Sequence, residues 1–145
     1  MPNVFIGIGS NLGKREDNIK QSLKLIKKKG ISIKKVSSII ETEPEGGPRQ
    51  GKFLNTAAHI QTKLSPLELL KELKSIEKEM GRVKGVKNGP RIIDLDILLY
   101  DDLKFKSPRL TIPHPRMYKR EFVMVPLKEI IKHPKEMPDE NNQVD

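Results

Sequence analysis

GPRIIDLDILLY (residues 89–100) has the pattern of a buried β-strand, yet it carries two aspartates. Side chains alternate between the two faces of a strand, so Asp94 and Asp96 share one face while Leu95 and Ile97 lie on the other. Carboxylates at this spacing stand about 7 Å apart, because each strand residue rises about 3.3 Å. At an effective dielectric constant of ~20 they repel each other by about 2.4 kcal/mol. Burial adds a desolvation cost, so the sequence predicts a cation beside the pair.

Strand and helix patterns alternate ahead of this stretch. The clearest helix starts at Ser65, because Ser65, Pro66 and Glu68 match an N-cap, a first-turn proline and a capping box. The face of this helix that is predicted to be buried carries Leu67, Leu70, Leu73, Ile76 and Met80. The predicted elements are a strand at 3–9, a helix at 15–30, an extended segment at 31–44, a strand at 52–64 and a helix at 65–81.

The strand with the two aspartates completes the order β-α-β-β-α-β. This order predicts an α+β fold, a ferredoxin-like antiparallel sheet with both helices on one face. A turn, a short strand and a Pro-rich loop are predicted over 100–117, followed by a short helix around Pro126. This C-terminal extension is expected to end in a polar, frayed tail at about 132–145. The length of 145 residues fits one domain, predicted to span residues 1–145.

The composition favours an anionic partner. The 28 Lys and Arg residues exceed the 19 Asp and Glu residues, which gives a net charge of +9. No apolar run approaches the ~20 residues of a membrane span, and the N-terminal residues lack the pattern of a signal peptide. The absence of cysteine excludes a disulfide framework and thiolate metal ligands. We therefore expect a cytoplasmic protein, although charge alone does not identify its partner.

Basic residues gather on both sides of the aspartate strand. They are Arg82, Lys84, Lys87, Arg91, Arg109, His114, Arg116, Lys119 and Arg120. Mg²⁺ commonly combines one or two carboxylates with substrate phosphates, and the forked donors of arginine suit phosphate oxygens. Asp94 and Asp96 beside these cations therefore predict a magnesium–nucleotide site. The alternative is an exposed strand edge, or a simple ion pair between one aspartate and Arg91.

Two further features bear on a small-molecule site. Phe53, Asn55 and Phe122 offer two aromatic rings and an amide, which suit a flat heterocycle, although phenylalanines are more often part of a core. GIGSNLG (7–13) lacks the spacing of a phosphate-binding loop and is interpreted as a strand-to-helix turn. The Gly/Pro-rich segment at 43–51 is predicted to be a mobile surface loop.

Several motifs together resemble one enzyme family. They are GIGSNLGKREDNI (7–19), SSIIETEPEGGP (37–48), FLN (53–55), KNGPRIIDLDILLY (87–100) and IPHPRMYKREFVMVPLKEI (112–130). In this order and spacing they are similar to the 6-hydroxymethyl-7,8-dihydropterin pyrophosphokinases of folate biosynthesis. The resemblance extends over roughly residues 3–131, and that family has the α+β ferredoxin-like fold.

This resemblance implies an activity and a set of site residues. The implied reaction moves pyrophosphate from ATP to the hydroxymethyl group of the reduced pterin and releases AMP. Two Mg²⁺ ions are expected on Asp94 and Asp96, and Arg82 and Arg91 are expected to stabilise the transferring group. The implied pterin pocket consists of Thr42, Phe53, Asn55 and Phe122. The implied ATP site consists of Glu77, Ile97, Arg109, Thr111 and His114, with Arg120 as an auxiliary cation. A monomer that binds neither nucleic acid nor membrane is expected.

The chain departs from the family pattern at four positions. Asn88 stands where many members carry an aromatic residue in the catalytic loop, which puts a closing contact in doubt. Lys74 and Lys84 stand where some relatives have glutamine and arginine, and neither is assigned a role. Gly51 replaces a frequent proline and is expected to loosen the loop before Phe53.

Two other functions are compatible with a basic ferredoxin-like domain. An RNA-binding module needs exposed aromatic residues on its central strands, where this chain is predicted to carry aspartates. A nucleotidyl transferase uses the same two-metal chemistry but attacks the α-phosphorus. The set of Phe53, Asn55 and Phe122 and the resemblance argue against this second alternative.

Overall fold

A central antiparallel sheet organises the computed structural model, which describes residues 1–131. Its strands are β1 (Asn3–Ser10), β2 (Ser32–Val36), β3 (Ile40–Thr42), β4 (Phe53–Gln61) and β5 (Asp94–Tyr100). The helices are α1 (Arg15–Lys28), α2 (Pro66–Glu79), η1 (Met117–Lys119) and α3 (Glu121–Ile130), and β6 (Phe105–Lys106) pairs with β7 (Thr111–Ile112). The predicted polar tail at about 132–145 lies outside the described residues.

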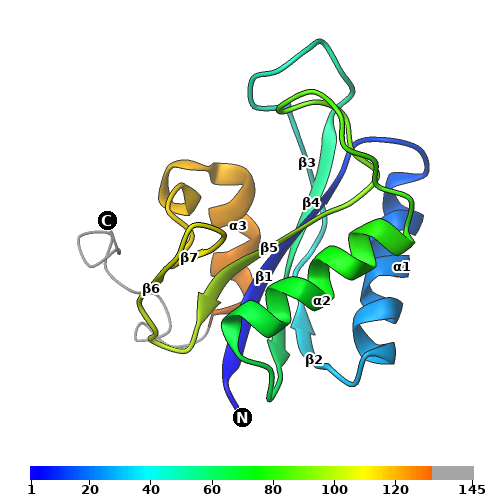
Figure 1. Cartoon of the computed structure of the whole chain (residues 1–145). Coiled ribbons are helices and arrows are strands. Elements are labelled where there is room, and N and C mark those ends of the chain that lie inside the picture. Colours follow the sequence, from blue (N-terminus) through cyan, green and yellow to red (C-terminus); the bar gives the residue numbers. More distant parts are fainter. Residues whose placement is uncertain (132–145) are drawn as a thin grey trace.

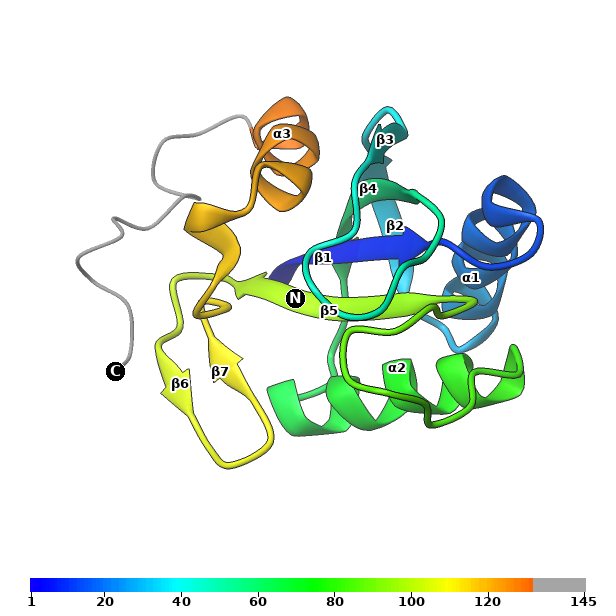
Figure 2. The ribbon, with the colours of Figure 1, turned by 90° about the horizontal axis from the view of Figure 1, so that it is seen from above.

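The strands follow the order β2-β4-β1-β5, and β3 also pairs with β4. Each pair of neighbours is antiparallel. Helices α1 and α2 cover one face of this sheet, and α3 lies on the other (Figures 1 and 2). The predicted antiparallel sheet with helices packed on it is therefore confirmed. No helix within residues 1–131 is long and apolar enough to cross a membrane.

Two predicted segments differ in the structure. The extended segment at 31–44 is broken into β2 and β3, which both pair with β4. The chain then leaves the ladder, and Ser37 accepts a hydrogen bond from the backbone nitrogen of Ala57 at 2.8 Å. The segment after β5 forms a hairpin of two short strands, β6 and β7, instead of one strand.

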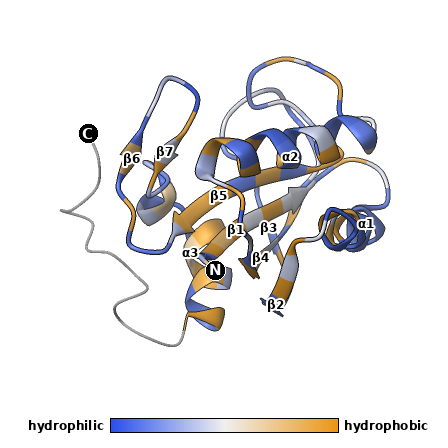
Figure 3. Ribbon diagram, turned by 60° about the horizontal axis from the view of Figure 1, so that its bottom comes forward, coloured by the Kyte–Doolittle hydropathy of each residue, from blue (hydrophilic) through white to orange (hydrophobic). Residues whose placement is uncertain are grey.

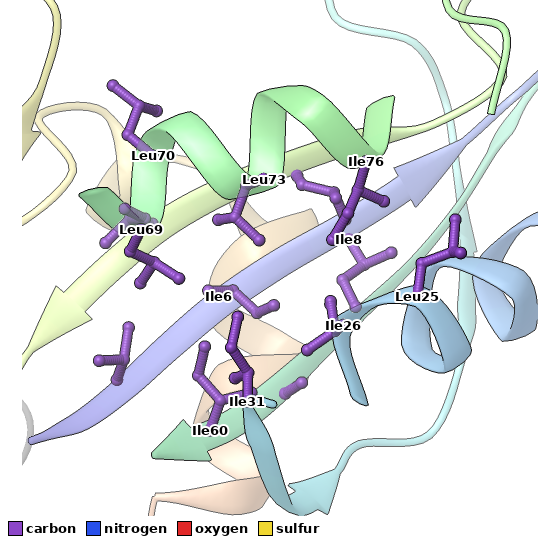
Figure 4. Close-up of a cluster of buried hydrophobic side chains, with 14 of the residues drawn as sticks. Ile6, Ile8, Leu25, Ile26, Ile31, Ile60, Leu69, Leu70, Leu73 and Ile76 are labelled. Carbon is purple, nitrogen blue, oxygen red and sulfur yellow. The ribbon is translucent and has the colours of Figure 1, made fainter. Parts of the chain in front are cut away.

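The larger core lies between the sheet and helices α1 and α2. Figure 4 shows Ile26 of α1 and Leu69, Leu73 and Ile76 of α2 beside side chains of β1 and β4. Leu67, predicted to be buried, is 44% exposed, while Leu69 is fully buried. Leu67 is the second residue of α2, and the buried stripe starts farther along the helix. The predicted capping box is present, since Ser65 and Glu68 exchange side chain–backbone hydrogen bonds.

A smaller core lies on the opposite face, under α3. It contains Phe5, Ala57, Leu98, Leu99, Met117, Leu127 and Ile130. Figure 3 shows the corresponding difference in hydropathy: α3 is largely hydrophobic, whereas α1 is mostly hydrophilic at the surface. Because α3 packs on this face, the residues at its N-terminal end lie close to the start of β5 on the same face of the sheet. Phe122 is one of these residues.

Candidate active site

The two aspartates lie at the start of β5, as the sequence predicts. Leu95 and Ile97 are buried in the core under α1 and α2, so Asp94 and Asp96 lie on the other face of the strand. Arg82 lies beside Asp94, with Nη1 at 2.9 Å from Oδ1, and Nη1 of Arg91 lies 3.8 Å from Oδ2. The predicted positive charge next to the pair is therefore supplied by these two arginines.

The pKa of the Asp96 carboxyl is raised by its surroundings. Burial, and secondarily the charge of Asp94, raise the pKa of the Asp96 carboxyl from 3.8 to about 8. At neutral pH this carboxyl is mostly protonated until positive charge is added nearby. The described residues contain no group of three or more metal-ligating side chains, so a metal here would take its remaining ligands from water or phosphate. The donor set of two carboxylates fits Mg²⁺ under that condition.

Gly9 forms the floor of a small cavity next to the aspartates. Across three adjacent strands, Asn55, Gly9 and Asp94 stand in one row. Neighbouring strands lie about 4.8 Å apart, so the outer two side chains flank an open gap of about 10 Å above the glycine. A Cβ at Gly9 would stand 2.8 Å from Oδ1 of Asn55. A side chain at position 9 would therefore fill this gap.

This cavity, which we call the phenylalanine pocket, has a volume of about 80 Å³. It brings together all four residues predicted for the pterin: Thr42, Phe53, Asn55 and Phe122. The Asn55 amide donates to Oγ1 of Thr42 at 2.7 Å, and Asn55 is only 8% exposed. Asp94 and Asp96 form part of the same wall. An aromatic ring system and a polar edge can therefore be held beside the carboxylates.

Arginines lie over both rings of the phenylalanine pocket. The guanidinium carbon of Arg91 is 5.3 Å from the ring centre of Phe53, and that of Arg120 is 5.5 Å from the ring centre of Phe122. Arg120 also pairs with Glu45 at 3.0 Å. Within residues 1–131, Nε of Arg91 is the only buried side-chain nitrogen or oxygen without a hydrogen-bond partner. Arg91 therefore has a donor to offer to a ligand.

A second cavity, which we call the histidine pocket, has a volume of about 270 Å³. Of the residues predicted for ATP it gathers Ile97, Arg109, Thr111 and His114. The hairpin of β6 and β7 carries Arg109 and Thr111, and the backbone nitrogen of His114 donates to the carbonyl of Leu98 at 3.0 Å. Burial, reinforced by Arg120, lowers the pKa of His114 to about 4, so the imidazole is neutral at pH 7.

Asp96 is the residue that the two cavities share. It lines the phenylalanine pocket on one side and the histidine pocket on the other. Two ligands that occupy the two pockets would therefore meet at this carboxylate. Arg120, which the resemblance assigns beside ATP, lines the phenylalanine pocket instead of the histidine pocket.

Glu77 also lies away from the histidine pocket. Its buried carboxylate accepts from Nη1 of Arg82 at 2.8 Å, from the backbone nitrogen of Leu95 at 2.7 Å and from Nζ of Lys74 at 3.2 Å. Glu77 and Arg82 line a third cavity of about 770 Å³ under the loop at 81–90. Glu77 therefore holds a predicted catalytic arginine and the start of β5 in place.

Gly9, Lys74 and Glu45 are among the pocket residues that were not assigned from the sequence. From the sequence, Gly9 is interpreted only as part of a turn. Its position in an apolar strand, opposite polar residues, is the signal that could have identified it. Lys74 lines the histidine pocket together with Asp96. Its spacing of three residues from Glu77 on a helix predicts their contact. Glu45 lines the phenylalanine pocket, and no local pattern marks it.

Comparison with known proteins identifies a family. A sequence model described as 7,8-dihydro-6-hydroxymethylpterin-pyrophosphokinase (HPPK) matches residues 5–132. The chain is 46% identical over 132 residues to the 2-amino-4-hydroxy-6-hydroxymethyldihydropteridine pyrophosphokinase of Bacillus subtilis, covering 90% of this chain and 79% of that protein. The corresponding enzyme of Aquifex aeolicus is 44% identical over 132 residues, covering 90% and 81%.

Other relatives are longer proteins. A mitochondrial folate synthesis bifunctional protein of Pisum sativum is 50% identical over 128 residues, which are 88% of this chain and 25% of that protein. The chain thus spans about a quarter of this relative. A crystal structure of an HPPK-DHPS in complex with substrates has a TM-score of 0.74 at 16% identity, covering 99% of this chain and 44% of that one. At this identity the match shows a shared fold.

Proposed function

The chain belongs to the 7,8-dihydro-6-hydroxymethylpterin-pyrophosphokinase family, and from this premise we propose that it transfers pyrophosphate from ATP to 6-hydroxymethyl-7,8-dihydropterin. The hydroxymethyl oxygen attacks the β-phosphorus, the bond to the α-phosphate oxygen breaks, and AMP leaves. The observation that carries this proposal is the position of Asp96 between two pockets, one suited to a flat ring and one lined by basic and polar residues. The step belongs to folate biosynthesis.

The phenylalanine pocket is proposed to bind the pterin. Phe53 and Phe122 stack on the ring. The Asn55 amide and the Thr42 hydroxyl, which are hydrogen-bonded to each other, also form hydrogen bonds to its polar edge. For the ring to lie between the phenylalanines, the guanidinium groups of Arg91 and Arg120 have to move aside toward the phosphates. The movement of these two arginines then couples stacking of the pterin ring to binding of the phosphates.

The histidine pocket is proposed to bind ATP. Arg109 and Thr111 supply donors, Ile97 supplies an apolar contact, and neutral His114 supplies a hydrogen bond without adding charge. Glu77 contributes to this site indirectly, since it holds Arg82. Arg120 is proposed to serve as an auxiliary cation from the pterin side. The triphosphate would then extend from this pocket toward Asp96.

Asp94 and Asp96 are proposed to hold two Mg²⁺ ions together with the triphosphate. When bound, these ions neutralise phosphate charge and activate the hydroxyl for attack. Arg82 and Arg91 stabilise the charge that develops on the transferring group, and Nε of Arg91, the one buried side-chain nitrogen or oxygen without a partner within the described residues, is a donor for this purpose. The protein otherwise positions the two substrates, which is most of what phosphoryl-type transfer requires.

The loops at 43–51 and 81–90 are proposed to close over both substrates and to exclude water. We also propose that the β2-β4-β1-β5 order is the ferredoxin-like arrangement. A single domain over residues 1–145, a monomeric state, a cytoplasmic location and the lack of nucleic acid and membrane partners stay predictions. The nucleotidyl transferase alternative is decided by the test below.

The test is product analysis with purified protein, Mg-ATP and 6-hydroxymethyl-7,8-dihydropterin. AMP that forms only with the pterin, without free pyrophosphate, is the expected result. ADP would indicate an ordinary kinase, and free pyrophosphate together with an adenylated pterin, without free AMP, would indicate attack at the α-phosphorus. The absence of any turnover, beside an active Bacillus subtilis relative as a positive control, would contradict the proposed activity.

A further inference from the structure

The turn between β1 and α1 holds three segments together through Asn11. The Asn11 side chain is largely buried, with the residue only 7% exposed. Its amide donates to Oε1 of Gln50 at 2.7 Å and to the carbonyl of Gly51 at 3.1 Å. Its Oδ1 accepts from the backbone nitrogen of Arg91 at 2.9 Å, and its own backbone nitrogen donates to the carbonyl of Arg91 at 3.2 Å. Arg91 is therefore fixed at both of its backbone polar groups by one residue.

The two loops that flank the phenylalanine pocket also contact each other directly. Nε2 of Gln50 donates to the carbonyl of Asn88 at 2.6 Å. Gly47 approaches the same carbonyl so closely that a Cβ there would collide with it, and the φ of Gly47 is +74°. Figures 1 and 2 show the β3–β4 loop lying beside the α2–β5 loop. Gln50 thus joins Asn11 on one side to Asn88 on the other.

These contacts connect the loops to the proposed chemistry. The guanidinium group of Arg91 lies over Phe53 and 3.8 Å from Asp94, and its Nε has no partner within residues 1–131. The direction of this side chain is set by the backbone that Asn11 holds. Displacement of a group that contacts the reacting atoms by about 1 Å can lower the rate by about a hundredfold.

A residue other than Asn11 closes the turn from within. Asn18 donates to the carbonyl of Leu12 at 2.9 Å and to Oγ of Ser10 at 3.3 Å, and so closes the turn from α1. Within residues 1–131, the side-chain hydrogen bonds of Asn11 instead all lead to residues 39 or more positions away, in the other two segments.

We propose that Asn11 is a positioning residue for Arg91 and, through Gln50, couples the two loops. This inference rests on the proposed function. Asn11 holds Arg91 where its guanidinium can contact the transferring group, and the path from Asn11 through Gln50 to Asn88 makes the loops at 43–51 and 81–90 move together.

Two nearly isosteric variants test the two parts of the proposal. Asn11→Asp replaces the donor toward Gln50 and Gly51 with a carboxylate oxygen, and repulsion from Oε1 of Gln50 and the Gly51 carbonyl pushes the side chain out of the place where it accepts from the Arg91 nitrogen. Gln50→Glu keeps the acceptor for Asn11 and places a carboxylate oxygen against the carbonyl of Asn88. Asn18→Asp is the control for the first variant, because it disturbs the same turn without contacting either loop. Gln61→Glu is the control for the second, since Gln61 donates only to Asn3 at the far end of the sheet.

Two measurements are made on each full-length variant: steady-state pterin-dependent AMP formation and backbone amide exchange without substrates. Asn11→Asp is expected to lower kcat about a hundredfold with the KM for ATP changed less than about threefold, and Asn18→Asp is expected to leave kcat within about threefold. Gln50→Glu is expected to speed exchange in both loops at least about fivefold, which Gln61→Glu does not.

The outcomes separate this inference from the proposed function. Equal kcat values for Asn11→Asp and Asn18→Asp would overturn the positioning role while the wild-type activity stands. Faster exchange in only one loop of Gln50→Glu would overturn the coupling. If the wild type forms no pterin-dependent AMP, the activity fails, and the exchange measurement still decides whether the two loops are coupled.

Discussion

Nη1 of Arg82 lies 2.8 Å from Oε2 of Glu77, a carboxylate that is almost completely buried. The same arginine nitrogen reaches Asp94 at 2.9 Å, so the guanidinium joins α2 to the first residue of β5. Glu77 also accepts the backbone nitrogen of Leu95. This contact between helix and strand therefore fixes both the aspartate pair and one of the proposed catalytic arginines.

Replacement of Glu77 is expected to weaken the fold and the site together. In Glu77→Gln the neutral amide loses the charge-assisted bond to Arg82, and the free energy of unfolding should fall by about 1–3 kcal/mol. Glu72→Gln is the matched control on the same helix, because Glu72 forms a more exposed pair with Lys29 and should cost less than about 1 kcal/mol. Urea unfolding measures both, and equal losses would refute the special role of Glu77.

The pH dependence of stability is expected to follow Asp96. Its pKa in the folded protein is about 8 and that of an unfolded aspartate is 3.8, so between these values the folded state binds more protons. The contribution of Asp96 to stability therefore decreases as the pH rises from about 4 to about 8. Asp96→Asn removes this loss and should be more stable than wild type by about 1–3 kcal/mol at pH 8, with little gain at pH 4.

The control for this titration is Asp102→Asn, at an exposed turn after β5. Urea unfolding of the metal-free proteins across pH 4–8 gives the difference between each variant and wild type. A constant difference for Asp96→Asn would show that its carboxyl titrates normally. The stabilised Asp96→Asn variant should at the same time lose pterin-dependent AMP formation by several orders of magnitude, as expected for a residue that is proposed to hold Mg²⁺.

A methyl group at Gly9 is expected to close the phenylalanine pocket. Gly9→Ala would place Cβ 2.8 Å from Oδ1 of Asn55, so the amide has to move and the KM for the pterin should rise about tenfold or more. Gly7→Ala is a stringent control, because it lies two residues earlier on the same face and its Cβ would be 3.6 Å from Leu98. Steady-state kinetics with varied pterin compares them, and an unchanged KM in Gly9→Ala would exclude the pocket as the pterin site.

The contact between the loops is expected to depend on Gly47. Gly47→Ala introduces a collision with the Asn88 carbonyl at a positive φ, so the loops should separate and kcat should fall about tenfold or more. Gly85→Ala lies in the other loop, where an added Cβ meets nothing within 4 Å, and should be nearly neutral. Single-turnover measurements with both variants decide this, and equal behaviour would mean that the loops do not need to touch.

Local patterns in the sequence were sufficient for some of these features. Alternation along β5 placed Asp94 and Asp96 on one face, and the capping residues at Ser65 located the start of α2. Both depend on residues within a few positions of one another, where the geometry of a strand or helix is known in advance.

Features that depend on contacts between residues far apart in the chain were not predicted from the sequence. The break between β2 and β3 depends on how residue 37 meets Ala57, and the exposure of Leu67 depends on where the core ends. Asn11 and Arg91 are 80 positions apart, and nothing near either residue indicates that they meet. Apart from the set of Phe53, Asn55 and Phe122, the pocket residues were grouped by resemblance to a family, since their proximity depends on the pairing of β3, β4 and β5 with strands elsewhere in the chain.

The position of α3 has a consequence for how the protein is made. The sheet, the aspartate pair, Arg82 and Arg91 all precede residue 101 in the chain, whereas Phe122 and the helix that packs under the sheet follow later. During synthesis on the ribosome, Phe122 is therefore the last residue of the phenylalanine pocket to be made. A nascent chain that has paired its strands still exposes Phe5, Leu98 and Leu99, and it completes the phenylalanine pocket only when α3 covers them.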